Sequence, residues 1–235
     1  FGFTHASVVG APIRIAAIIA DQAASLIGNA CFNKMDAKIT LGTGTFLNVN
    51  TGDKCRGSRN GAHPMIAWSI RLRGKESEKT DSTVYYTERQ FNDSSTLIRF
   101  AKTVGLCSNV EELSDMAFSV TDSNGVTFIP KFYSTAGFIG YKQSPTKCHL
   151  VRAVLESVVF IVAQFYFLNQ EEQHDFHYKK MRIDGGISAN DFICQSIADL
   201  LNVSIERGKN SSEITSLGCA YLAAFNCGIF EKLEH

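Results

Sequence analysis

The 235-residue sequence carries no net charge at neutral pH, because 23 lysines and arginines balance 23 aspartates and glutamates. A protein that binds nucleic acid or anionic lipid over a broad surface normally has an excess of positive charge. The composition therefore argues against both kinds of partner, and any basic patch would have to be local.

The sequence also lacks the cysteine pattern of a zinc site or of a disulfide-stabilised domain. Its seven cysteines are scattered, and no two of them form a C-x-x-C pair. Disulfide frameworks use even numbers of cysteines, and structural zinc sites use closely spaced ligand pairs. We therefore expect free thiols and a reducing, cytoplasmic location.

No apolar run is long enough to cross a bilayer. The longest one covers residues 157–168, whereas a membrane span needs roughly 20 residues. This run predicts a buried helix, within a longer helix expected from Thr146 to Leu168, and no membrane span.

What the sequence does contain is an alternation of strand and helix patterns. Apolar residues make up 45% of the chain, which is enough for a sizeable core. A mainly apolar, β-branched run, interrupted only by Arg14, predicts a strand over Pro12–Ala20, buried on both faces, and a helix that starts at Asp21. A hairpin surrounds Gly42 to Gly44, and a strand ending at Asp184 leads to a helix capped by Ser188.

The remaining segments fit the same α/β pattern. Because the first hairpin is antiparallel, we expect a sheet with mixed strand directions, flanked by helices. The other predicted elements are a strand around Trp68, a solvated loop over 71–82, helices over 95–105 and over 109–120 with an Asn109 cap, a strand over 125–134 ending at Pro130, a short strand over 203–208 and a helix over 211–230.

Gly42, Thr43 and Gly44 interrupt a strand-like segment with very little side-chain material. Glycine lets a backbone N–H approach an anion closely, and the threonine hydroxyl adds a donor, so the segment could contact a phosphate. A tight hairpin turn explains the same residues and is the more common reason for them.

A second bare junction follows a predicted strand at Asp184, Gly185 and Gly186. Two such junctions in one domain could hold opposite ends of a nucleotide. The G-x-G-x-x-G dinucleotide spacing is absent, and close packing of a helix on a strand is an equally good explanation.

Four segments together resemble one enzyme family. They read ADQAASLIGNACF, AKITLGTGTFLNVNTG, AGFIGYKQSPTKCHLVRAVLES and MRIDGGISANDFICQSIADLL. In this order they resemble consecutive blocks of the FGGY carbohydrate kinases, most closely the glycerol kinase branch. The third block follows the family's second signature, with His149 and Leu150 in place, and departs from it at Tyr141.

The resemblance implies a two-lobed, actin-like ATPase fold of the ribonuclease H-like type, with MgATP in the cleft between the lobes. Residues 1–36 would end the amino-terminal lobe, and residues 37–235 would form the carboxyl-terminal lobe. The rest of the amino-terminal lobe, with its own phosphate loop and magnesium-directing acid, would be a missing partner. A homodimer is left open.

The resemblance also assigns roles to individual residues. Asp21 would act as the catalytic base on the acceptor hydroxyl, Gln22 would touch the polyol, and Phe46 would pack on the carbon face of the polyol. The chain would use ATP and Mg²⁺, with no metal ligand of its own. The nucleotide-binding residues would be Gly42, Thr43, Gly44, Gly185, Gly186 and Asn190.

Two departures from the family leave alternatives open. Ser94 stands near an expected glycine of the nucleotide contact, and Tyr133 leads almost directly to Gly137 where the family has a longer loop.

The main interpretation is ATP-dependent phosphorylation of glycerol, or a related polyol, to glycerol 3-phosphate. The alternatives are an inactive scaffold and an ATPase without a small acceptor, although the Asp21–Gln22 pair argues against the latter. For His174 and His177 we predict no function.

Overall fold

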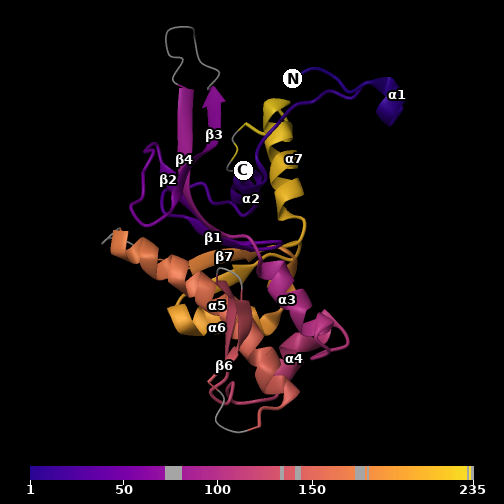
Figure 1. Cartoon of the computed structure of the whole chain (residues 1–235). Helices are drawn as coiled ribbons and strands as arrows, with labels where there is room; N and C mark the ends of the chain where they lie inside the picture. Colours follow the sequence, from indigo (N-terminus) through magenta and orange to yellow (C-terminus); the bar gives the residue numbers. More distant parts are fainter. Residues whose placement is uncertain are drawn as a thin grey trace. The chain divides into compact units, whose positions relative to one another are not determined.

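The structure is a computed structural model (Figure 1). It describes residues 1–71, 81–132, 135–140, 144–172, 178, 180–231 and 233. These residues divide into two compact units. Unit 1 comprises Phe1–Lys38, Asn48–Glu88 and Ser212–His235, and unit 2 comprises Ile39–Leu47 and Arg89–Ser211. Most of the predicted loop over 71–82, together with Tyr133, Tyr141, His174 and His177, lies outside the described residues.

Six strands join in the order β3-β4-β2-β1-β7-β8, and β5 and β6 form a separate pair. The predicted hairpin consists of β1 (Ala37–Leu41) and β2 (Thr45–Gly52). In unit 1, β3 (His63–Arg71) pairs antiparallel with β4 (Asp81–Phe91), with a register shift between Ile66 and Trp68. In unit 2, β7 (Lys180–Asp184) pairs parallel with β8 (Ser204–Arg207). The prediction of mixed strand directions is confirmed.

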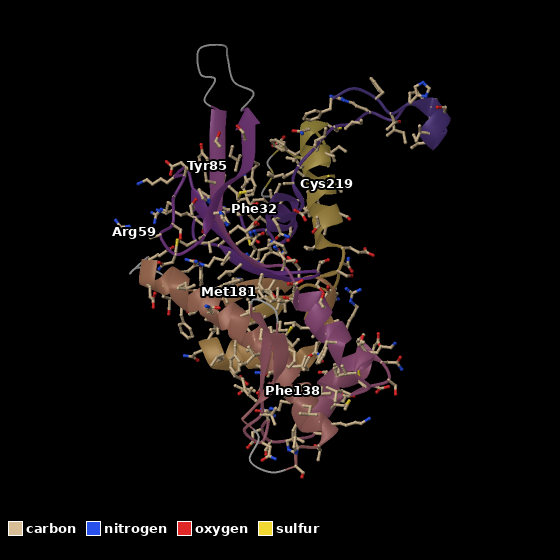
Figure 2. All side chains as sticks on the ribbon, viewed as in Figure 1. Phe32, Arg59, Tyr85, Phe138, Met181 and Cys219 are labelled. Carbon is tan, nitrogen blue, oxygen red and sulfur yellow. The ribbon has the colours of Figure 1, made fainter. Side chains whose placement is uncertain are left out.

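Two helices of unit 1, α2 (Asp21–Gly28) and α7 (Ile214–Asn226), pack directly against each other. A Cβ on Gly218 would collide with the carbonyl oxygen of Ala24, and one on Gly28 would collide with that of Ile214. Glycine is therefore needed on both helices for this close approach. Residues of α2 also belong to a core cluster, against which the partly buried Phe32 packs (Figure 2). The cluster consists of Ala23, Leu26, Ile27, Cys31, Ala67, Trp68 and Tyr86.

The predicted strand over Pro12–Ala20 is wrong for this structure. Among the described residues, the only β-pairing of this segment is an isolated bridge between Phe3 and Arg14, after a short helix α1 (Ala6–Val9). Ile13 is 56% exposed and Ile18 is 66% exposed, so the segment is not buried on both faces. A strand depends on hydrogen-bonded neighbours, and the apolar pattern alone did not show whether neighbours would be present.

The core of unit 2 is built on one long helix, α5 (Lys147–Glu172), which packs against three other helices and a strand (Figure 1). The neighbours are α3 (Ser94–Thr103), α4 (Leu113–Phe118), α6 (Asp191–Leu201) and β5 (Thr127–Phe132), which pairs antiparallel with β6 (Thr135–Ile139). By length and composition α5 could cross a membrane, but 61% of its most apolar stretch is buried inside the protein. The predicted buried helix is confirmed, and it extends beyond the apolar run on both sides.

Three predicted element boundaries need correction. Ser188 lies in a 3₁₀ turn, η2 (Gly186–Ala189), and its hydroxyl donates to the Gly185 carbonyl at 2.6 Å, so it does not cap a helix. Asn190 caps α6 instead. Asn109 precedes a 3₁₀ turn, η1 (Val110–Glu112), without a capping bond, and Pro130 lies within β5 rather than at its end. A cap must satisfy local backbone donors, and the residue that does so depends on the exact turn before the helix.

Candidate functional site

The two glycine-rich junctions of unit 2 meet. The hairpin between β1 and β2 is closed by a hydrogen bond from the Gly42 N–H to the Gly44 carbonyl at 2.9 Å. Gly185, which follows β7, lies so close to this hairpin that a Cβ on it would collide with the Leu41 carbonyl oxygen. The structure therefore brings together the two segments that the sequence singled out.

Packing explains two of these glycines. Gly185 has φ +90, a backbone conformation that side chains disfavour. A Cβ on Gly44 would lie 2.6 Å from the carbonyl oxygen of Phe91. Close approach to neighbouring backbone thus accounts for a glycine at both positions, and the assignment of Gly44 and Gly185 to the nucleotide stays a prediction.

Packing does not explain Gly42 and Gly186. Neither has a positive φ, and a Cβ on either residue would meet no described atom within 4 Å. At these positions the missing side chain leaves the backbone open. Gly186 also lines a cavity, where an open backbone allows an anionic ligand to approach closely. The Gly42 N–H is already bonded within the hairpin, so at Gly42 only the space beside the backbone is open.

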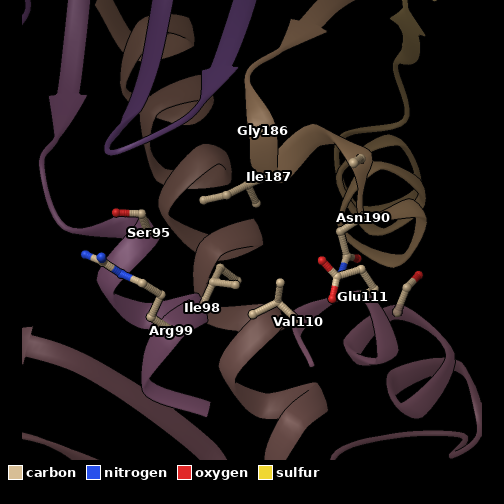
Figure 3. Close-up of a pocket in the computed structure, with 10 residues that line it drawn as sticks. Ser95, Ile98, Arg99, Val110, Glu111, Gly186, Ile187 and Asn190 are labelled. Atoms are coloured by element: carbon tan, nitrogen blue, oxygen red, sulfur yellow. The ribbon is translucent and has the colours of Figure 1, made fainter. Parts of the chain in front are cut away.

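A cavity of about 380 Å³ lies beside Gly186 in unit 2 (Figure 3). Its size falls in the range of small-molecule sites, roughly 300 to 1,000 Å³. It combines apolar walls with a few polar groups, as such sites usually do. Its lining residues come from α3, η1, α4 and η2 and from the cap of α6, and they include Ile98, Arg99, Val110, Glu111, Ile187 and Asn190.

The two amide atoms of Asn190 serve different purposes. Its Oδ1 accepts a hydrogen bond from the Ile193 N–H at 3.0 Å and so caps α6. Among the described residues none accepts a hydrogen bond from Asn190 Nδ2. Because Asn190 also lines the cavity, this donor is available to a ligand.

The hairpin and α3 are joined by polar contacts. The Thr43 carbonyl accepts a hydrogen bond from the Ser95 N–H at 3.1 Å, while the Thr43 side chain is exposed. Ser94 is buried, and its hydroxyl lies 2.7 Å from the hydroxyl of Thr45. Ser94 thus contributes to internal packing.

Asp21 and Gln22 lie in unit 1 at the start of α2. The exposed Asp21 carboxylate accepts a hydrogen bond from the Gln22 N–H at 2.7 Å. The negative charge of Asp21 also acts on the buried Tyr86. Burial raises the pKa of the Tyr86 phenol, and the negative charges of Glu88 and Asp21 raise it further. Asp21 is therefore exposed to solvent but lies near a group of polar side chains, Gln22, Tyr86 and Glu88, which we call its polar neighbourhood.

Lys38 is a member of this neighbourhood that sequence reasoning missed. It is fully buried, and its Nζ donates to Gln22 Oε1 at 2.6 Å. Glu88 on β4, which accepts from the side chain of Asn48 at 2.9 Å, was missed as well. In the sequence, the feature that could have indicated Lys38 is a lysine inside the short apolar strand AKITL. Glu88 could not be recognised as a buried residue, because the sequence did not predict β4.

Phe46 is half-buried in unit 2. A Cβ on Gly44 would lie 3.1 Å from the edge of its ring, so the ring lies beside the hairpin. Its assignment to the polyol stays a prediction, as do the roles of the other site residues.

Within the described part of the chain, no three histidine, cysteine, aspartate or glutamate side chains gather as a metal-binding group. The seven cysteines, all of which lie in that part, are free thiols.

Comparison with known proteins identifies the family. Residues 37–227 match the C-terminal domain of the FGGY family of carbohydrate kinases. The chain is 39% identical over 248 residues to glycerol kinase 5 of Gallus gallus and 34% identical over 245 residues to glycerol kinase 2 of Thermotoga maritima. Both matches cover 100% of this chain but only 44% and 47% of those relatives, so the chain spans less than half of their length.

Solved structures agree with this result. The crystal structure of Plasmodium falciparum glycerol kinase with ADP matches 95% of this chain and 44% of its own, with a TM-score of 0.82 and 28% identity. A xylulose kinase from Lactobacillus acidophilus matches 90% of this chain and 42% of its own, with a TM-score of 0.67 at 19% identity, and so supports the fold alone. The predicted actin-like fold and kinase family are confirmed: this chain belongs to the FGGY family of carbohydrate kinases and carries its C-terminal domain.

Proposed function

We propose that the protein takes part in ATP-dependent phosphorylation of glycerol, or a related polyol, to glycerol 3-phosphate. The relatives named glycerol kinase and the ADP in the Plasmodium falciparum structure support this proposal. The observation that carries it is the pair Gly42 and Gly186, whose open backbone has no explanation in the packing of the chain. Residues 1–36 would end the amino-terminal lobe, residues 37–235 would form the carboxyl-terminal lobe, and the protein would act in the cytoplasm.

The nucleotide side of the reaction would use residues of unit 2. The cavity beside Gly186 suits an adenosine, because apolar side chains can cover the base while Asn190 Nδ2 offers a donor. The backbone at Gly42 and Gly44, together with the exposed Thr43 hydroxyl, would face the phosphates. The ATP would supply the phosphoryl group, and Mg²⁺ would neutralise its charge without a ligand that we assign to this chain.

The acceptor side would use residues of unit 1. The Asp21 carboxylate would accept the proton of the attacking hydroxyl, and Gln22 would hold the polyol in place. Phosphoryl transfer requires mainly in-line positioning and charge neutralisation, so one exposed carboxylate with a neighbouring amide is a sufficient set on this side.

The variant Asp21→Asn tests this assignment because it keeps the shape of the side chain and removes the base. In a form of the protein that includes the amino-terminal lobe, we expect glycerol phosphorylation to fall by about 100-fold or more. Binding of ATP, measured as a thermal shift, should stay unchanged in the same variant. Retained phosphorylation would remove Asp21 from the role of base.

An inactive scaffold is the second candidate. The observation in its favour is Ser94, whose hydroxyl is bonded to Thr45 where the family resemblance leads us to expect a glycine that contacts the nucleotide. Thermal unfolding with and without MgATP separates the two candidates, because a scaffold that has lost nucleotide binding would show no stabilisation.

A further inference from the structure

The polar neighbourhood around Asp21 contains a feature that the proposed chemistry does not explain. Lys38 is a fully buried lysine in β1 whose ammonium group donates to Gln22 Oε1 at 2.6 Å. Burying a charged ammonium group is unfavourable unless hydrogen bonds compensate for the loss of water. A lysine in this place therefore calls for a reason beyond packing.

The chemistry of this contact fixes the orientation of Gln22. An ammonium group has three donors and no acceptor, so the amide end facing Lys38 must be the oxygen. The Gln22 Nε2 donors then face away from Lys38. Among the described residues none accepts a hydrogen bond from Nε2, which leaves these donors available to a ligand.

We propose that Lys38 is a positioning residue for the acceptor site: by holding Gln22 Oε1, it presents Gln22 Nε2 as a fixed hydrogen-bond donor to an acceptor hydroxyl oxygen. The inference rests on the proposed function. Asp21, the preceding residue on α2, offers only acceptor atoms when ionised. The pair thus provides one donor and one acceptor side by side, a combination that fits a polyol, because each hydroxyl both gives and receives a hydrogen bond.

Without Lys38, the amide of Gln22 could rotate and present either end to the ligand. A free side chain also loses rotamer entropy when it binds, and a side chain held in advance avoids part of that loss. Lys38 would therefore act on the affinity for the polyol and would not touch the polyol itself.

The test uses the 235-residue chain with an isotope label on its glutamine side-chain amides. In the wild type, we expect the Gln22 amide to be ordered on the nanosecond timescale by NMR relaxation and to shift when glycerol is added. In Lys38→Met, whose side chain is of similar length without the charge, the amide should become mobile. The apparent Kd for glycerol should rise by up to about tenfold, as expected when a side chain that was held in advance must instead be ordered on binding.

Controls separate positioning from a general effect on folding. Lys54→Met removes an exposed lysine of the same unit and should leave both readouts unchanged. Lys38→Gln keeps a neutral donor and should recover part of the order, and it also serves if Lys38→Met fails to fold. ATP binding should stay the same in all three variants.

The outcomes distinguish the inference from the proposed function. If the Gln22 amide is equally ordered with and without Lys38, or if the Kd for glycerol does not change in Lys38→Met, the inference is wrong and the proposed function stands. If the wild-type amide is ordered but glycerol at high concentration shifts no signal of Gln22, the proposed acceptor role fails, and the inference fails with it.

Discussion

Gly185 and Gly186 are neighbours in the sequence, yet their surroundings differ completely. Gly185 has a positive φ and lies against the backbone at Leu41, whereas Gly186 has neither restriction and faces open space. The packing of the chain thus requires a glycine at position 185. It does not require one at position 186, where binding of a ligand is the proposed reason for a glycine.

This difference predicts opposite results for two alanine variants. Gly185→Ala should destabilise the protein by about 2 kcal/mol or more, because the new methyl group collides with backbone and the φ angle is unfavourable. Gly186→Ala should change the free energy of unfolding by less than about 0.5 kcal/mol but weaken ATP binding. Urea unfolding and an ATP-dependent thermal shift measure the two effects. Unchanged ATP binding in Gly186→Ala would argue against a close approach of the nucleotide there.

Tyr86 predicts a pH dependence of stability at alkaline pH. Its pKa in the folded protein is raised above the ordinary value of 10.0 by burial, Glu88 and Asp21, so the folded state favours the neutral phenol. The contribution to stability is therefore complete below about pH 10 and is lost as the pH rises above it. Tyr86→Phe keeps the ring and removes the hydroxyl, so its stability should fall less steeply between about pH 9 and about pH 11. Equal slopes in chemical denaturation would contradict this explanation.

At the scale of elements, the contact between α2 and α7 depends on two glycines. In the interior of an ordinary helix, replacing glycine by alanine is stabilising by about 1 kcal/mol. At Gly218 the added methyl group would overlap the Ala24 carbonyl, so the two helices would have to move apart.

Gly218→Ala is therefore expected to destabilise the protein, against the usual effect on a helix. We expect a loss of about 1 to 3 kcal/mol, as for other overpacked sites. Ser216→Ala, at an exposed position of the same helix, is the matched control and should be neutral or slightly stabilising. Both values come from chemical denaturation. A stabilised Gly218→Ala would mean that the helices lie farther apart than described.

The helices and strands that the sequence predicted well are those with a strong local pattern. The predicted helices over 95–105, 146–168 and 211–230 correspond to α3, α5 and α7, and the predicted strand before Asp184 corresponds to β7. The failures depended on partners elsewhere in the chain. The segment over residues 12–20 has the composition of a strand but few hydrogen-bonded neighbours, and β4 begins within a charged segment whose composition predicts a loop.

The candidate site shows the same division. The glycine junctions and the Asp21–Gln22 pair were visible as short motifs, because each depends on adjacent residues. The contact from Lys38 to Gln22 joins two elements, and the cavity combines α3, η1, α4 and η2. Such contacts arise from the fold, so a local pattern can single out a residue such as Gly186 or Asn190 but does not show which residues it will meet.

At the scale of the whole molecule, the chain covers only 44% of the length of the relative from Gallus gallus. The catalytic advantage of positioning requires groups on both sides of the reacting atoms. Most of the groups that the family resemblance implies for the amino-terminal lobe are not in these 235 residues.

We therefore expect the purified 235-residue chain to show no ATP-dependent phosphorylation of glycerol, while ATP still raises its thermal stability. A coupled assay for ADP release in the presence of glycerol measures the first, and a melting curve measures the second. The matched control is an intact glycerol kinase assayed under the same conditions. Turnover comparable to that control would show that one lobe is sufficient.

The boundary between the two compact units crosses the chain four times, after Lys38, Leu47, Glu88 and Ser211. Three of these crossings lie inside strands β1, β2 and β4, where no flexible linker can be cut. A single proteolytic nick or truncation thus cannot release either half intact. Each unit is built from segments that are separated in the sequence, so neither could be expressed as one continuous fragment. During translation, unit 2 is complete only when residue 211 has been synthesised, and unit 1 is completed after that.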